Sequence, residues 1–168
     1  MLIVFAGLPG TGKTTLARLL GVELRAPVLR IDAIEAAVVR GGAATHPVGP
    51  VGYYVAEEVA ATNLAIGLPV VIDAVNSVGE AREIWVALAA RARVPLRTIE
   101  LVLSDVDEHR RRVERRTGDL ACGHTPTWAQ VLDREYEPWV PDRDGERIVV
   151  DAADRQTALT AIRAYLAG

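Results

Sequence analysis

Apolar residues in this sequence follow two alternating patterns. Short apolar runs occupy residues 2–6, 27–31, 69–73, 96–103 and 147–151, and the run at 96–103 is less purely apolar. Continuous runs of this kind are typical of strands buried on both faces of a parallel sheet. Longer segments between these runs carry apolar residues three and four positions apart, which is the spacing of a helix packed on one face. Because strand-like runs alternate with helical segments, the sequence predicts an α/β fold with a five-stranded parallel sheet between two layers of helices.

The boundaries of the predicted helices come from capping residues, glycine and proline. Capping boxes, which satisfy the free amides of a first helical turn, are predicted at Ser77 with Glu80 and at Thr127 with Gln130. The helix after Thr127 is expected to place four apolar or aromatic residues on one face: Trp128, Val131, Leu132 and Tyr136. Other helices are predicted over 15–20, 33–40 and 53–66 and after residues 104 and 151. Glycine and proline predict loops over 41–52 and 117–126.

Composition is that of a globular protein of one domain, 1–168. Half of the 168 residues are hydrophobic and 24% are charged. No apolar run approaches the ~20 residues of a membrane span, and no export signal precedes the first strand, so we expect a cytoplasmic protein without a membrane partner. Cys122 is the only cysteine, which excludes a disulfide within the chain and a cysteine-based metal site. The net charge of −3 argues weakly against a polyanionic partner.

The clearest chemical motif is the P-loop pattern G-x-x-x-x-G-K-[ST] at residues 7–14. It follows an apolar run and precedes a helical segment, which is the context that the motif requires. Glycines let successive backbone amides point inward, and the start of the following helix adds the positive end of its dipole. The motif therefore predicts a site for a nucleoside triphosphate and Mg²⁺ with nucleotide-binding residues Gly7, Pro9, Gly10, Thr11, Gly12, Lys13, Thr14 and Thr15.

Lys13 is the only lysine among 19 lysines and arginines. A compact ammonium on a flexible stem differs chemically from a planar guanidinium. We therefore expect the Lys13 ammonium to reach the β- and γ-phosphates, where a guanidinium could not replace it. The Thr14 hydroxyl is expected to bind Mg²⁺.

Three further polar residues follow predicted strands, where ligands bind in parallel sheets. Asp32 follows the second strand, and it is either a catalytic base for an attacking hydroxyl or the N-cap of a helix. Asp73 ends the third strand. It is either a second ligand of Mg²⁺ or a turn residue. Asn76, three residues later, is either a substrate ligand or the start of a loop.

Residues 109–116 form the one dense basic run. Arg112 and Arg116 are four residues apart and project from one face of a helix. At a phosphate site they can stabilise the charge that develops on the transferred group, and we favour them over Arg115 as catalytic residues. The alternative is a solvent-facing surface. A nucleic-acid partner is less favoured because no aromatic stacking platform accompanies the run.

Taken together, these motifs resemble the small P-loop kinases of the predicted-kinase group that is often labelled "AAA family ATPase". The group is related to chloramphenicol phosphotransferase, gluconate kinase, zeta toxin and the 5′-kinase domain of polynucleotide kinase. The resemblance rests on GLPGTGKTT at 7–15, Ile31-Asp32, the D-x-x-N sequence from Asp73 to Asn76, the R-x-x-x-R helix, and WAQVLDREYEPW at 128–139.

The resemblance implies a sheet in the order 2-3-1-4-5, a small helical lid at about 112–126 and ATP as the phosphate donor. It also implies that Asp32 is the general base and that Arg112 and Arg116 are lid arginines. Polynucleotide-kinase-like members often carry an arginine a few residues after the base. Here Glu35 and Ala36 occupy that neighbourhood, and Arg40 is the nearest candidate for a substrate ligand.

These features favour an ATP-dependent kinase that acts on a hydroxyl of a small molecule, as a monomer or homodimer. A polynucleotide or RNA 5′-hydroxyl kinase is the main alternative, and a P-loop ATPase without kinase activity is a weaker one. A GTPase would need an N/T-K-x-D guanine motif, which requires a second lysine. A mechanochemical ATPase would need a further helical subdomain, for which 168 residues leave little room.

Overall fold

The computed structural model describes residues 1–115 and 126–168. Its sheet contains β1 (Leu2–Ala6), β2 (Val28–Arg30), β3 (Val70–Asp73), β4 (Leu96–Val102) and β5 (Arg147–Asp151). Every neighbouring pair of strands is parallel, and their order is β2-β3-β1-β4-β5. The predicted fold class and strand order are confirmed.

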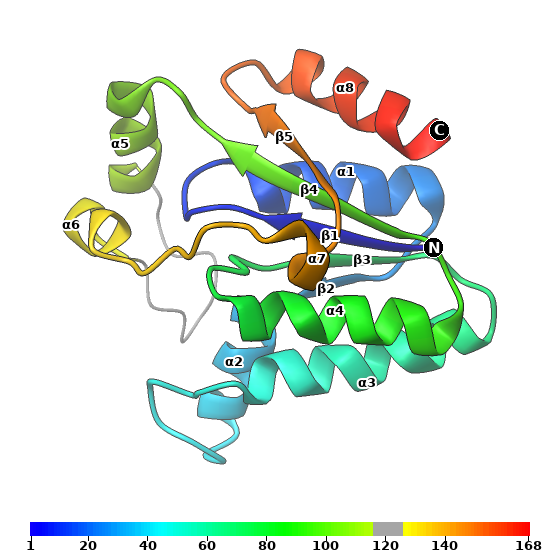
Figure 1. The fold of residues 1–168 in the computed structure, drawn as a ribbon. Coiled ribbons are helices and arrows are strands. Elements are labelled where there is room, and N and C mark those ends of the chain that lie inside the picture. The colour runs from blue at the N-terminus through cyan, green and yellow to red at the C-terminus, as the bar shows by residue number, and fades with distance from the viewer. Residues whose placement is uncertain (116–125) are drawn as a thin grey trace.

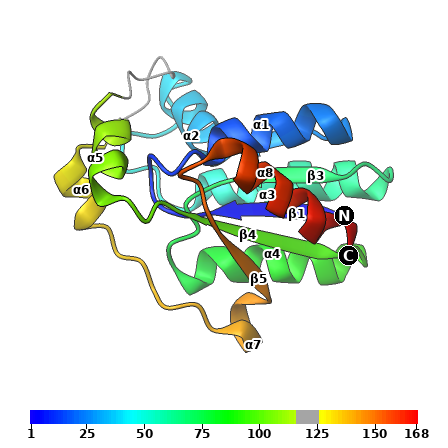
Figure 2. The same ribbon diagram turned by 90° about the horizontal axis from the view of Figure 1, so that it is seen from above.

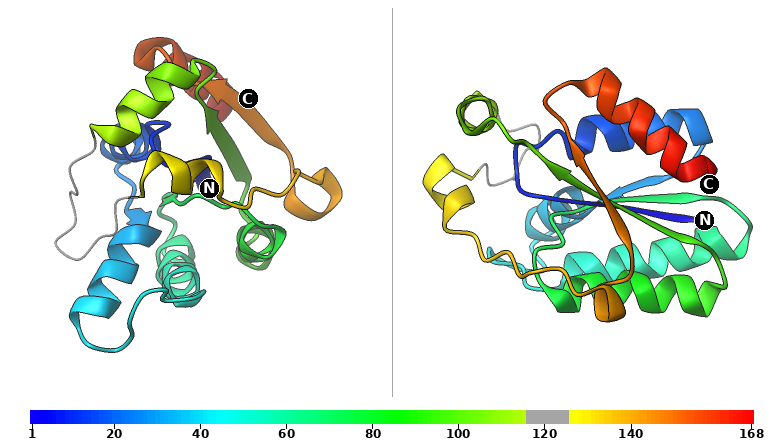
Figure 3. Two further views of the ribbon diagram at one scale, coloured as in Figure 1. Left: turned by 90° about the vertical axis from the view of Figure 1, so that its left-hand side faces the viewer. Right: turned by 45° about the horizontal axis from the view of Figure 1, so that its top comes forward.

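Helices cover both faces of the sheet. Figures 1 and 3 show α1 (Lys13–Leu24) and α8 (Arg155–Ala167) on one face, with α3 (Val51–Ala65) and α4 (Gly79–Ala92) on the other. The remaining helices are α2 (Ile31–Arg40), α5 (Val106–Glu114), α6 (Trp128–Leu132) and α7 (Pro141–Asp144). None of the helices in the described ranges has both the length and the apolar character that a membrane crossing requires.

The central strand β1 explains why there are two cores. Successive side chains of a strand point to opposite faces. Ile3 and Phe5 accordingly join the core beneath α1 and α8, whereas Leu2 and Val4 join the core beneath α3 and α4. All five residues of β1 are at most 1% exposed, so the strand has no solvent face. The continuous apolar run that opens the sequence follows from this double burial.

The carboxyl ends of the strands form one edge of the molecule. In Figures 1 and 2 the loop between β1 and α1 lies at this edge, and α5 and α6 lie beyond it, while both chain ends lie at the opposite edge. The residues expected to carry the chemistry therefore meet at the edge where open parallel sheets bind their ligands.

The structure corrects two helix boundaries. Helix α4 has Val78 as its N-cap with no side-chain cap, so the capping box predicted at Ser77 is wrong. The amide of Gly79 donates instead to the carboxylate of Glu137 at 2.9 Å. Helix α6 ends at Leu132 and does not reach Tyr136, whose hydroxyl donates to Glu100 on β4 at 2.7 Å. In both cases a hydrogen bond to a residue distant in sequence takes the place of the contact that the local sequence predicts.

The capping box at Thr127 is confirmed, because its hydroxyl accepts from the amide of Gln130 while the Gln130 side chain accepts from the Thr127 amide. This local cap fixes the start of a helix of only five residues.

Gly7, the first residue of the P-loop, has no room for a side chain. Its φ is 125°, a conformation that L side chains rarely adopt, and a Cβ built on it would lie 2.2 Å from the carbonyl oxygen of Leu101 on β4. Its amide donates to the carbonyl of Val75 at 3.1 Å. The chain can turn out of β1 beside β4 only because this position is glycine.

We predict that Gly7→Ala lowers the free energy of unfolding by about 3 kcal/mol, because it combines backbone strain with a clash against the backbone. Gly42→Ala is the matched control, since Gly42 also has a positive φ of 74° but no atom within 4 Å of its added Cβ. The control should lose about 1 kcal/mol from backbone strain alone. Equilibrium urea unfolding measures both values, and equal losses would show that the close approach to β4 does not matter.

Candidate active site

The loop from β1 to α1 has the backbone shape of a phosphate cradle. Gly10 and Gly12 have φ values of 88° and 99°, and α1 begins at Lys13, with Gly12 as its N-cap. Left-handed residues next to a helix start turn consecutive amides toward one point, and the helix dipole favours an anion there. Around Gly10 the loop is packed against α5, because an added Cβ would lie 2.6 Å from Val113 and 3.2 Å from His109.

The side chains of Lys13 and Thr11 are bonded to the backbone of this loop. Lys13 is 8% exposed, and its ammonium donates to the carbonyl oxygen of Leu8 at 2.9 Å. The Thr11 hydroxyl donates to the same oxygen at 3.0 Å. The lysine side chain therefore folds back on the loop, and its ammonium is bonded to the loop backbone.

Thr14 and Asp73 form a direct link between α1 and β3. The Thr14 hydroxyl donates to the Asp73 carboxylate at 2.7 Å, and Asp73 is 4% exposed. Among the described residues, no three His, Cys, Asp or Glu side chains come together as a metal site. A hydroxyl and one carboxylate are nonetheless the donors that suit Mg²⁺, which keeps several waters and takes further oxygens from phosphates. The pair fits the ion that the sequence predicts.

Asp32 lies in the first turn of α2, but it is not the cap of that helix. The N-cap is Arg30, and no side chain caps the helix, so the capping interpretation of Asp32 is wrong. The Asp32 side chain is 53% exposed, which leaves its carboxylate accessible to a ligand.

Arg30, which the sequence analysis did not single out, connects the two carboxylates. Its guanidinium lies 3.5 Å from an oxygen of Asp32 and 3.9 Å from an oxygen of Asp73, and its side chain is 7% exposed. Asp32 and Asp73 therefore contact the same guanidinium, and Asp73 in turn pairs with Thr14. A lone arginine at a strand end belongs to no motif, and only its place directly before Asp32 could have drawn attention to it.

His109 is a second residue that the sequence did not identify. It is 7% exposed, and its Nε2 lies 2.7 Å from the carbonyl oxygen of Pro9 in the P-loop. Its ring meets the ring of Trp128 edge-on, with the centroids 5.1 Å apart. One histidine therefore joins α5, α6 and the P-loop. Its position in a basic run concealed this role, because such runs are usually solvated.

Next to Asp32 lies a group of ionisable side chains from α2, α3 and the segment after α6. Burial raises the pKa of Glu35, the charge of Asp32 adds to this shift, and His46 and Arg134 oppose it. Burial likewise raises the pKa of Tyr53 to about 12, and the negative charges of Glu35 and Asp32 add to this effect. Arg134 therefore lies within electrostatic range of Glu35 and Tyr53.

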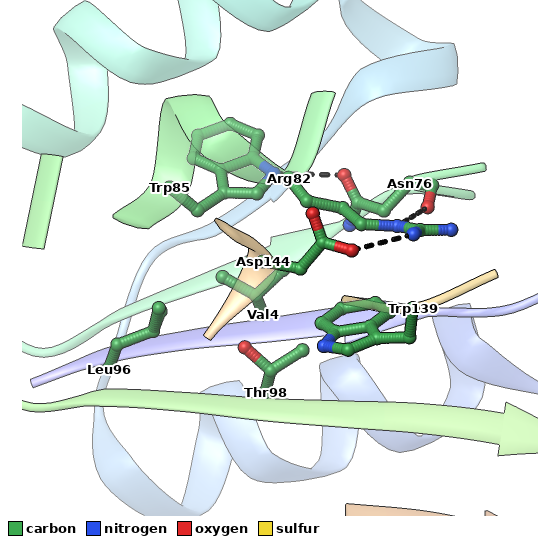
Figure 4. Close-up of a pocket in the computed structure, with 8 residues that line it drawn as sticks. All are labelled: Val4, Asn76, Arg82, Trp85, Leu96, Thr98, Trp139 and Asp144. Atoms are coloured by element: carbon green, nitrogen blue, oxygen red, sulfur yellow. Dashed lines mark hydrogen bonds and ion pairs between the residues drawn. The ribbon is translucent and has the colours of Figure 1, made fainter. Parts of the chain in front are cut away.

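Asn76 is part of the scaffold and does not face a ligand. It is completely buried, its amide nitrogen donates to the carbonyl of Phe5 at 2.9 Å, and its amide oxygen accepts from the Trp85 indole at 2.9 Å. Figure 4 shows Asn76 turned inward between Trp85 and Arg82. The expectation of a substrate contact is corrected, because both polar groups of the side chain are used inside the protein.

The structure also corrects the expectation for Arg112. Its guanidinium donates to Glu108 at 2.8 Å and to the carbonyls of Ala152 and Ala153 at 2.9 and 3.0 Å. It therefore fastens α5 to the turn after β5 and is not directed to a phosphate.

Arg40 is exposed at the other end of α2 from Asp32, about 12 Å away along the helix axis. Arg116, Cys122 and most of the predicted lid lie outside the described residues.

Comparison with known proteins agrees with this geometry. The family model described as "AAA domain" matches residues 2–135, which include the P-loop, Asp32 and Asp73. No curated protein matches the chain.

Among solved structures, a candidate kinase from Chloroflexus aurantiacus is similar to 99% of this chain over 96% of its own, with 25% identity and a TM-score of 0.78. A gluconokinase from Sinorhizobium meliloti matches 98% of this chain over 90% of its own, with 21% identity and a TM-score of 0.67. The APS kinase of Mycobacterium tuberculosis in complex with AMPPNP and APS matches 99% over 97%, with 20% identity and a TM-score of 0.63. The chain belongs to the AAA domain family and has the fold of the P-loop kinases.

Proposed function

We propose that this protein is an ATP-dependent kinase that transfers the γ-phosphoryl group to a hydroxyl group of a small molecule. The observation that carries the proposal is the continuous set of contacts from Thr14 to Asp73, from Asp73 to Arg30 and from Arg30 to Asp32. These contacts connect an accessible carboxylate to the P-loop, which supports the proposal because transfer to an alcohol needs a base close to the phosphate.

In this proposal the P-loop binds the nucleotide. Backbone amides of the loop and of the first turn of α1 hold phosphate oxygens. The proposed nucleotide-binding residues are Gly7, Pro9, Gly10, Thr11, Gly12, Lys13, Thr14 and Thr15. Among them Pro9 has no N–H and the Gly7 amide donates to Val75, so these two residues shape the loop and donate no bond to a phosphate. The Lys13 ammonium exchanges the carbonyl of Leu8 for a phosphate oxygen, since an anion is a stronger partner than a neutral carbonyl.

Thr14 and Asp73 would hold Mg²⁺, which neutralises negative charge on the phosphates when it is bound. The protein's own contribution is to fix these two oxygen donors at the ends of α1 and β3. Asp73 is nearly inaccessible, and its contact with Thr14 determines where the carboxylate points.

Asp32 is the proposed catalytic base. Its exposed carboxylate accepts the proton of the acceptor hydroxyl as the oxygen attacks the γ-phosphorus. Arg30 orients this carboxylate from the buried side. The acceptor then lies against Asp32, Glu35 and Tyr53, with Arg134 within electrostatic range of Glu35 and Tyr53.

The compared proteins support a small acceptor. The solved neighbours include a gluconokinase, a sugar kinase and an APS kinase. We expect the protein to act in the cytoplasm, where ATP is available, as a monomer or homodimer.

The decisive test is a screen of hydroxyl compounds (sugars, nucleosides, hydroxylated antibiotics and 5′-hydroxyl oligonucleotides) for ATP-dependent ADP release. Activity with oligonucleotides alone, falling steeply with salt, would favour the polynucleotide alternative.

We predict that Asp32→Asn lowers the rate of phosphoryl transfer to the acceptor found in the screen by a factor of about 10² to 10⁴, because an amide cannot accept the hydroxyl proton. Affinity for a fluorescent ATP analogue should change little, since Asp32 lies outside the P-loop. Glu58→Gln, which neutralises an exposed carboxylate on α3, is the matched control and should keep wild-type turnover. Normal transfer by Asp32→Asn would exclude Asp32 as the base.

We also predict that Lys13→Arg lowers transfer by about 10²-fold, because a planar guanidinium on a longer side chain cannot occupy the place of the ammonium within the loop. Arg18→Lys makes the reverse exchange on the exposed face of the same helix and should change the rate less than twofold. ADP release by both variants, measured at saturating ATP, checks the prediction. If Lys13→Arg turns over like the wild type, Lys13 does not contact the transferred group.

A further inference from the structure

Arg82 on α4 is a buried guanidinium whose hydrogen-bonding groups are all used. Its side chain is 1% exposed, and its guanidinium donates five hydrogen bonds. A guanidinium has five N–H groups, so each of them has an acceptor. The acceptors are the carbonyls of Asn76, Ser77, Glu137 and Pro138 and the carboxylate of Asp144.

These acceptors belong to two segments that are distant in sequence. We call residues 74–78, between β3 and α4, the β3–α4 turn, and residues 133–145, between α6 and β5, the strap. Arg82 bonds to the turn at 2.9 and 3.0 Å and to the strap at 2.8, 2.9 and 3.2 Å. Figure 4 shows the guanidinium of Arg82 between Asn76 and Asp144.

The β3–α4 turn follows Asp73 directly and is bonded to the P-loop and to the strand before it. The carbonyl of Val75 accepts from the amide of Gly7 at 3.1 Å, and the side chain of Asn76 donates to the carbonyl of Phe5 at 2.9 Å. Asn76 itself has a φ of 53°, a conformation that costs about 1–3 kcal/mol in a residue other than glycine. The turn therefore needs surrounding contacts to keep this shape, and Arg82 supplies two of them.

The strap is held mainly by side chains. The Trp139 ring contacts two guanidinium groups, that of Arg82 at 4.5 Å from the ring centre and that of Arg147 at 4.7 Å. Asp144 is fully buried, which by itself would raise its pKa, but hydrogen bonds from Arg143, the Val140 amide and Arg82 lower the pKa to about 2. Asp144 is therefore ionised opposite Arg82 at neutral pH.

Stability alone is a poor account of this arrangement. Removing a guanidinium from water costs several kcal/mol, and well-packed apolar residues are often as stable as a buried ion pair. What an apolar residue cannot do is hold five acceptors at fixed positions. The distinctive effect of Arg82 is therefore geometric, and two of its five bonds fix the turn that follows Asp73.

We propose that Arg82 is a positioning residue for the metal site: by fixing the β3–α4 turn, it sets the place of the Asp73 carboxylate relative to Thr14 and the P-loop. This inference rests on the proposed function, in which Thr14 and Asp73 hold Mg²⁺. Arg82 touches neither residue and acts through the backbone of the turn.

The test is the Mg²⁺ dependence of binding of a fluorescent ATP analogue by the Arg82→Lys variant. Lysine keeps the charge but has three donors on a flexible stem, so it cannot hold both segments. Removing a residue that orients a metal ligand typically weakens metal affinity by 10–100-fold, so we expect the Mg²⁺ concentration for half-maximal enhancement to rise about tenfold. Binding of the analogue without Mg²⁺ should equal that of the wild type.

Arg147→Gln is the matched control. Arg147 also stacks on Trp139 and pairs with Glu100, so the substitution loosens the strap and leaves the bonds from Arg82 to the turn. It should lower the melting temperature and keep the wild-type Mg²⁺ midpoint. All titrations are made at a temperature where circular dichroism shows each variant folded. Should Arg82→Lys not fold, Asp144→Asn replaces it, because a neutral amide holds Arg82 less firmly and should give a smaller rise.

An unchanged Mg²⁺ midpoint in folded Arg82→Lys, or in Asp144→Asn if that variant replaces it, would overturn the inference and leave Arg82 a residue of the scaffold. An equal rise in Arg147→Gln would overturn it too, because the effect would then come from the strap. Failure of the wild type to bind the ATP analogue would instead contradict the proposed function. A raised midpoint confined to the Arg82 or Asp144 variant supports the positioning role.

Discussion

The hydrogen bond between Thr14 and Asp73 is the interaction on which the site depends. It joins the first turn of α1 to the end of β3, two segments brought together only because β1 pairs with β3 in a parallel sheet. Every other element of the site is placed relative to this pair. The P-loop leads into Thr14, the β3–α4 turn leaves from Asp73, and Arg30 extends the contact from Asp73 to Asp32.

Arginine has structural roles in this chain that a count of charges does not reveal. Arg30 lies between two carboxylates, Arg82 bonds to four backbone carbonyls and a carboxylate, and Arg112 fastens α5 to the turn after β5. A guanidinium presents several donors in a rigid plane, so it can satisfy the carbonyls of irregular segments that no sheet or helix pairs. The single lysine lies instead in the loop where a mobile point charge is useful.

Local sequence predicted the strands, the P-loop and the capping box at Thr127, but the capping box predicted at Ser77 is replaced by a bond from Gly79 to Glu137. The strands were predicted from short apolar runs, and the runs of β1 and β3 follow from the burial of these two strands on both faces. The P-loop was predicted because its glycines, its lysine and the helix start act within eight consecutive residues. The capping box of Thr127 belongs to the same class, since its two hydrogen bonds span three residues. The strand order came from the resemblance to P-loop kinases, and the observed sheet confirms it.

Only the tertiary structure decided which distant groups each polar side chain meets. Asn76 and Arg112 were expected to face ligands, yet both are bonded to backbone carbonyls from other elements, and His109 reaches across 100 residues to Pro9. The partner of such a side chain depends on which segments the packing of the sheet brings within about 3 Å, and neither its own type nor its neighbours in sequence encode this. The sequence by itself thus determined the strands, most of the helices and the chemistry of the loop. The folded chain determined which carboxylates, arginines and carbonyls stand together around it.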